Sequence, residues 1–135
     1  MMTPLYAALL GLMLIMLSIK IIKTRRKYHV SLGDANSIEM KRCMRAQANF
    51  SEYTPIFLIL LAFSEMKGLS LWAVNLFGTV FFVGRIMHAY SLLRHEQYDT
   101  TQKLLNNPKF RIYGMTCTLV TIGSVAIIIL IQSAI

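Results

Sequence analysis

The centre of the chain carries a stripe of polar residues whose types and spacing could bind an ionic ligand. These residues are Arg42, Arg45, Asn49 and Glu52, at positions i, i+3, i+7 and i+10, with Tyr53 beside them. In a helix this spacing places the side chains on one face. Ionisable groups at membrane depth are costly and usually mark a function. We therefore interpret the stripe as a candidate binding site.

The same helix face becomes apolar further along the chain, at Ile56, Ile59 and Phe63. A face that changes from charged to apolar with depth suits a ligand with an ionic head and an apolar partner. The alternative for the two arginines, Arg42 and Arg45, is that they extend to lipid phosphates. That alternative does not account for Asn49 or Glu52, because both lie deeper in the helix.

A second group of polar residues follows in the next predicted helix. Arg85 and His88 are three residues apart and share one side, and Tyr90 lies nearby. Arg111 stands at the start of the last helix. Three alternatives remain open: a structural pair of Glu52 with Arg85, a hydrogen-bonded core histidine at His88, and an interfacial anchor at Arg111.

The elements that position these residues are four predicted membrane helices in a single domain over residues 1–135. Hydrophobic residues make up 56% of the chain and charged residues 15%, whereas soluble domains have about 25% charged residues. Runs near the spanning length of about 20 residues predict helices over residues 4–23, 38–66, 71–93 and 110–131. No positive segment precedes the first run, so we expect a retained anchor rather than a signal peptide. The predicted fold class is an all-α, integral membrane four-helix bundle.

Basic residues predict the orientation of this bundle. Eight of them lie in or beside the first connection and four in or beside the third, while the second turn has only Lys67. The positive-inside rule places both long connections in the cytoplasm and both termini on the periplasmic side. Since the positive charges fall between apolar runs, we expect no nucleic-acid partner. The two cysteines form no CxxC pair, so the sequence predicts no metal site.

Two segments resemble a known family. The run from Arg45 to Pro55, RAQANFSEYTP, resembles the second-helix signature of the MAPEG family, the membrane-associated proteins in eicosanoid and glutathione metabolism. The run from Gly84 to Tyr90, GRIMHAY, is similar to the third-helix segment of bacterial members. The resemblance implies a homotrimer in a bacterial inner membrane. It also implies a glutathione site between subunits, open to the cytoplasm.

The resemblance further implies roles for the polar residues. Arg111 would be the catalytic residue that stabilises the glutathione thiolate. A thiol has a pKa near 8.5, and a nearby guanidinium lowers that pKa. The thiolate would then attack a hydrophobic electrophile dissolved in the bilayer, with glutathione as co-substrate. The residues implied to bind glutathione are Arg42, Arg45, Asn49, Glu52, Tyr53, Arg85, His88 and Tyr90.

The chain departs from some members of that family. Ala48 stands where some eicosanoid-forming members have a further arginine, Tyr90 comes early, and the 94–109 connection is long. We therefore expect a general glutathione transferase or peroxidase that serves detoxification. The alternative is a non-catalytic member that binds lipid or a partner protein. A small multidrug transporter is disfavoured, because the first helix has no acidic residue.

Overall fold

The protein is a bundle of four long helices, described by a computed structural model for residues 1–134. The helices are α1 (Thr3–Tyr28), α2 (Ile38–Met66), α3 (Leu71–Tyr90) and α4 (Lys109–Ala134). A five-residue π-helical turn, η1 (Ser91–His95), continues α3. Within the described residues no β-strand forms beyond one isolated bridge between Tyr98 and Leu104. The all-α prediction is therefore confirmed.

The helix bounds follow local signals in the sequence. Ser37 caps α2 by accepting a hydrogen bond from the Met40 amide, and Ser70 caps α3 through the Ala73 amide. Such caps satisfy amides that have no partner inside the helix. The helix α1 runs to Tyr28, beyond the expected end at residue 23, because its basic run consists largely of good helix formers.

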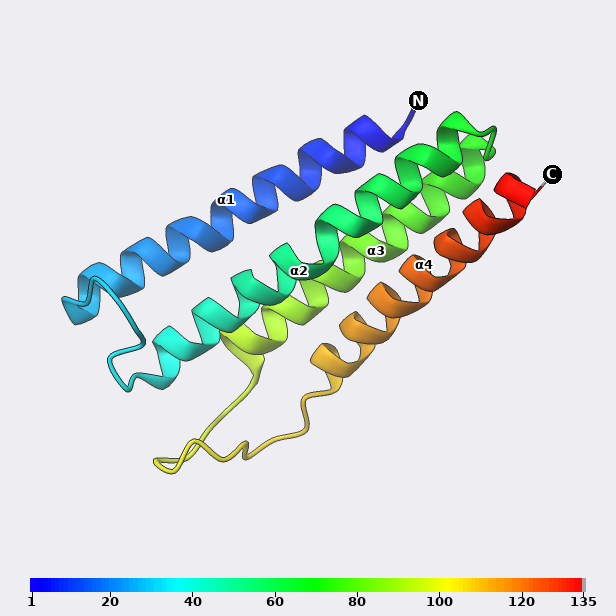
Figure 1. Cartoon of the computed structure of the whole chain (residues 1–135). Coiled ribbons are helices and arrows are strands. Elements are labelled where there is room, and N and C mark those ends of the chain that lie inside the picture. Colours follow the sequence, from blue (N-terminus) through cyan, green and yellow to red (C-terminus); the bar gives the residue numbers. More distant parts are fainter. Residues whose placement is uncertain (135) are drawn as a thin grey trace.

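The helices run alongside one another in an up-and-down order (Figure 1). The two termini and the short α2–α3 turn lie at one end, and both long connections lie at the other. Along the bundle α3 packs mainly against α4, and α1 packs mainly against α2. The two basic connections therefore share one end, as the predicted orientation requires.

Three segments have the length and apolar composition of membrane spans: Thr3–Tyr28, Leu71–His95 and Lys109–Ala134. The helix α2 falls outside this set because its first half carries the polar stripe, yet it packs against α1, α3 and α4. Large apolar side chains such as Leu12, Trp72 and Leu130 are exposed on the bundle surface. Lipid would cover these side chains in a membrane.

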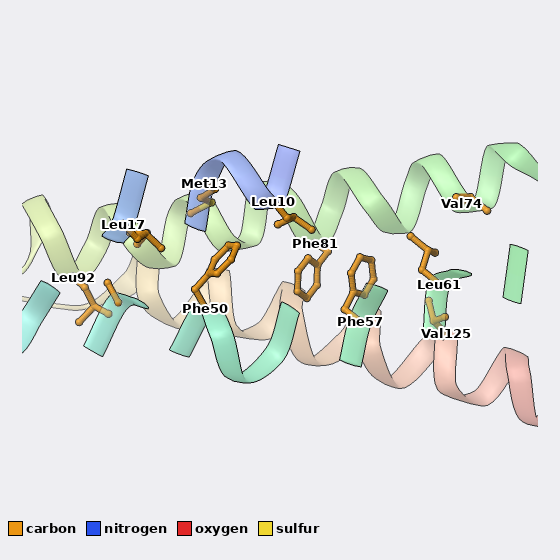
Figure 2. Packing of buried hydrophobic residues seen from close by; sticks show 12 residues of the cluster. Leu10, Met13, Leu17, Phe50, Phe57, Leu61, Val74, Phe81, Leu92 and Val125 are labelled. Carbon is orange, nitrogen blue, oxygen red and sulfur yellow. The ribbon is translucent and has the colours of Figure 1, made fainter. Parts of the chain in front are cut away.

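An apolar core runs along the bundle axis between the helices. Phe57 of α2 and Phe81 of α3 stack with ring centroids 3.8 Å apart, and both are fully buried. Figure 2 shows that α1 adds Leu10, Met13 and Leu17 to the same core. Packing of this kind fixes how each helix is rotated. The direction of the polar stripe on α2 follows from that rotation.

A contact between two glycines brings α3 and α4 unusually close together. A Cβ atom added to Gly114 would lie 2.5 Å from the Gly84 carbonyl oxygen and 2.7 Å from the His88 amide nitrogen. Small residues allow membrane helices to approach to this distance. Arg111 lies one turn before Gly114, so this contact holds the start of α4 beside the end of α3.

Candidate functional site

A cavity opens between α2, α3 and α4, toward the end of the bundle that carries the long connections. Its volume is about 580 Å³, within the range of small-molecule sites. Four of the predicted site residues line it: Arg45 and Asn49 from α2, His88 from α3, and Arg111 from α4. The tertiary structure thus brings together residues that are up to 66 positions apart in the chain.

A second cavity of about 280 Å³ adjoins the first and shares Arg45, Leu92 and Arg111 with it. Its wall also includes Lys41 and Arg42. Within the described chain, neither wall contains an Asp or a Glu. The two cavities together form a region of concentrated positive charge, which favours an anionic ligand.

Arg85 lies beneath this region and is 1% exposed. Its Nη1 atom donates a hydrogen bond to the Asn49 Oδ1 atom at 2.8 Å, while its Nε atom has no partner among residues 1–134. The interpretation of Arg85 as the ion-pair partner of Glu52 is therefore wrong, since the α2 group that meets it is an amide. A buried guanidinium without a counter-ion is costly, and its charge adds to the potential around Asn49.

Besides Arg85, three predicted residues line neither cavity. Glu52 is exposed on the outer surface of α2 and forms no ion pair among residues 1–134. The Tyr53 ring is part of the apolar packing and lies 5.8 Å from the Arg85 Cζ atom. Tyr90 is 48% exposed and packs edge-on against Phe110. Their assignment to a glutathione site stays a prediction.

Arg111 is more than an isolated interfacial residue, because it forms an ion pair. Its Nη1 atom lies 3.1 Å from the Oε2 atom of Glu96, in the α3–α4 connection. The Glu96 side chain is completely buried and also accepts hydrogen bonds from the Ser91 and Tyr98 hydroxyl groups. Glu96 is not among the site residues predicted from the sequence. The available signal was an acidic residue shortly after the predicted third helix, directly beside Arg94 and His95.

The α3–α4 connection lies against the polar start of α2. The Lys41 Nζ atom donates to the Gln102 Oε1 atom at 2.8 Å, and the Arg42 guanidinium lies 5.6 Å from the centre of the Tyr98 ring. Burial raises the pKa of Tyr98, and the hydrogen bond to Glu96 raises it further. The phenol therefore stays protonated at neutral pH and can donate to Glu96.

The comparisons with known proteins agree with the sequence resemblance. A family model described as the MAPEG family matches residues 3–131. The inner membrane protein YecN of Escherichia coli K12 is 38% identical over 90 residues, which are 67% of this chain and 69% of YecN. YecN of Escherichia coli O6:H1 matches to the same extent. These matches confirm the predicted family resemblance and the predicted location in a bacterial inner membrane.

Proposed function

The chain belongs to the MAPEG family of integral membrane proteins, and from this premise we propose that it binds glutathione and activates its thiol toward hydrophobic electrophiles. One observation carries the proposal: Arg45 of α2 and Arg111 of α4 line a single cavity whose wall has no carboxylate within residues 1–134. Such a cavity favours a small anion over a cation. Its position beside the α3–α4 connection opens it toward the predicted cytoplasmic side.

Glutathione matches the charge pattern of this region. It carries two carboxylates, one ammonium group and one thiol. Guanidinium groups bind carboxylates with paired hydrogen bonds, which suits Arg45 and Arg42. An exposed carboxylate such as Glu52 suits the ammonium group, if a neighbouring subunit contributes it. The binding roles of Glu52, Tyr53, Arg85 and Tyr90 belong to this proposal.

Arg111 is the group that stabilises the thiolate in this mechanism. The glutathione S–H proton leaves to solvent, and the guanidinium favours the remaining anion. The sulfur electron pair then attacks the electrophilic carbon and forms a C–S bond, while the leaving group departs with its electron pair. The protein supplies charge and orientation, so it needs no nucleophile of its own.

The α4 side of the cavity provides a route for an apolar substrate. Ile112, Met115 and Leu119 line the cavity, and both Ile112 and Leu119 are also exposed on the bundle surface. An electrophile dissolved in the bilayer can therefore reach the cavity from the lipid side. A hydroperoxide is the other class of substrate. Two glutathione molecules would reduce it to an alcohol and water and form glutathione disulfide.

The test is glutathione binding by the purified protein in detergent, measured by isothermal titration calorimetry. We expect the wild type to bind and Arg45→Ala to bind at least about tenfold more weakly, because one charge-assisted contact is lost. Arg94→Ala is the matched control, since Arg94 is exposed and lines neither cavity. The absence of binding by the wild type would remove the glutathione proposal.

A non-catalytic role in binding lipid or a partner protein is the second candidate. The observation that favours it is the ion pair of Arg111 with Glu96, because this pair already offsets part of the arginine charge. Turnover of a chlorinated nitroaromatic compound with glutathione discriminates between the two candidates. No turnover above the uncatalysed rate favours the non-catalytic role, whereas equal turnover in wild type and Arg111→Ala would show that Arg111 is not the catalytic residue.

A further inference from the structure

The ion pair between Arg111 and Glu96 has a geometry that points to a specific role for Glu96. We infer that Glu96 is a positioning residue. It orients the Arg111 guanidinium toward the cavity, and its carboxylate offsets part of the positive charge of that guanidinium. This inference rests on the proposed glutathione function. It concerns a residue of the α3–α4 connection that lines neither cavity.

The π-helical turn η1 fixes the position of Glu96. The Glu96 amide donates to the Ser91 carbonyl oxygen at 2.9 Å, which is the i to i+5 bond of a π-helix. The Ser91 hydroxyl donates to the Glu96 Oε1 atom at 3.0 Å, and the Tyr98 hydroxyl donates to Oε2. The backbone and the side chain of Glu96 are therefore both held by hydrogen bonds. A carboxylate held in this way can fix the group it contacts.

The contact to Arg111 leaves most of the guanidinium free. Only the Nη1 atom bonds to Glu96, at 3.1 Å, whereas an arginine has five N–H donors in a rigid plane. The Arg111 side chain is 37% exposed and lines both cavities. One fixed nitrogen restricts the orientation of the group, and the remaining donors can meet a ligand.

Glu96 also changes the electrostatic balance around Arg111. The charged and titratable groups that share the cavities with Arg111 come from α2, α3 and the connection: Lys41, Arg42, Arg45, His88 and Tyr98. Glu96 is the carboxylate that pairs with Arg111 in the described chain. Its negative charge opposes thiolate formation, while its hydrogen bond orients the arginine. The two effects have opposite signs, so two substitutions can separate them.

The substitution Glu96→Gln removes the charge and preserves the hydrogen bonds. The amide oxygen can accept from Arg111 and Tyr98, and the amide nitrogen can donate to the Ser91 hydroxyl. We expect the glutathione thiol to ionise more readily in this variant. The midpoint of the pH profile of kcat should shift to lower pH by about half a unit or more.

The substitution Glu96→Ala removes both the charge and the contact that orients Arg111. We expect kcat at neutral pH to fall by about tenfold or more, because the guanidinium is no longer fixed. The midpoint of the pH profile should move to higher pH, toward the value of a free thiol. A merely structural role of Glu96 would lower the yield of folded protein and leave the midpoint of both variants unchanged.

The matched control is Asp99→Asn, which removes one negative charge from the same connection. The Asp99 carboxylate caps a local turn through Thr101 and Lys103 and does not contact Arg111. The midpoint of the pH profile of kcat in Asp99→Asn should equal that of the wild type. The reaction is glutathione with a chlorinated nitroaromatic compound, and the ultraviolet absorbance of bound thiolate is recorded over the same pH range.

The outcomes separate this inference from the proposed function. A wild type that forms thiolate, with shifts of opposite direction in Glu96→Gln and Glu96→Ala, supports the positioning role. A wild type that forms thiolate, with both Glu96 variants matching Asp99→Asn, overturns the positioning role and leaves the proposed function in place. A wild type with no thiolate signal overturns both.

Discussion

At the scale of single residues, the unusual feature is a buried arginine that meets an amide in place of a carboxylate. Arg85 is held by Asn49, and its Nε atom is without a hydrogen-bond partner in the described chain. Charged groups at membrane depth are normally paired. The missing negative charge leaves a positive potential beside the cavity wall at Asn49. This agrees with a site that receives its counter-ion from a ligand.

Substitutions at Asn49 test this interpretation. We expect Asn49→Ala to lower the free energy of unfolding by about 1–3 kcal/mol, because a second nitrogen of Arg85 loses its partner. Asn49→Asp should raise stability, since it supplies a carboxylate, and should weaken glutathione binding by removing the positive potential. Thermal unfolding in detergent measures the stability of both variants, and calorimetry measures their glutathione binding. The control is Ser51→Ala, at an exposed position of α2. Equal melting temperatures for Asn49→Ala and Ser51→Ala would contradict the stabilising contact between Asn49 and Arg85.

Tyr98 offers a pH-dependent test at the same scale. Burial, and then the hydrogen bond to Glu96, raises its pKa in the folded protein. A raised pKa means that Tyr98 contributes stability fully below the unfolded pKa of about 10. That contribution is lost as the pH rises through the folded pKa. The difference in phenolate absorbance between wild type and Tyr98→Phe should therefore titrate above pH 10, and a midpoint at or below that pH would refute the buried contact.

At the scale of elements, the contact between α3 and α4 decides the geometry of the site. Gly84 and Gly114 allow these helices to approach closely, and this approach sets His88 and Arg111 around one cavity. The π-helical turn η1 continues α3 and delivers Glu96 to Arg111. The site therefore depends on one close helix crossing and one irregular turn.

The glycine contact can be tested by substitution within α4. Gly114→Ala places a methyl group 2.5 Å from the backbone oxygen of Gly84, so the helices must separate. We expect a loss of about 1–3 kcal/mol in unfolding free energy and weaker glutathione binding. Gly123→Ala is the matched control, because its Cβ atom would meet nothing within 4 Å and alanine is the better helix former. Thermal unfolding compares the stability of the two variants. Equal stability of Gly114→Ala and Gly123→Ala would contradict the close contact between α3 and α4.

At the scale of the whole molecule, one chain leaves two of the predicted site residues, Glu52 and Tyr90, on its outer surface. Glu52 is exposed on α2 at membrane depth, where a carboxylate without a partner is costly. The isolated chain also exposes many large apolar side chains. A neighbouring subunit would cover part of this surface and would supply a partner for Glu52. The homotrimer implied by the family therefore remains our proposal for the assembly.

The assembly has a direct test by native mass spectrometry of the protein released from detergent. We expect three copies in the wild type. Glu52→Ala should weaken glutathione binding by about tenfold if Glu52 completes the site, whereas Ser51→Ala should bind as the wild type does. A monomer that binds glutathione with unchanged affinity in Glu52→Ala would contradict the shared site.

Local features of the sequence predict the four helices, the position of both long basic connections at one end of the bundle, and the polar stripe on α2. These features depend on local quantities, namely the length of apolar runs, the helical period and the count of basic residues. The bounds of α2 show this, because the Ser37 cap and the Lys67-Gly68 stop are local signals next to the ends of the helix in the chain. The family resemblance suggests glutathione as the ligand, because the helical spacing of the polar residues alone does not identify a ligand.

Which polar groups meet depends on the tertiary structure. It paired Arg85 with Asn49 instead of Glu52, placed Tyr90 away from the cavities, and joined Arg111 to Glu96. Contacts between helices depend on how far each helix is rotated and how closely it approaches its neighbour. Those quantities follow from the packing of the whole core and from the close contact of Gly84 with Gly114. No local pattern in the sequence encodes them.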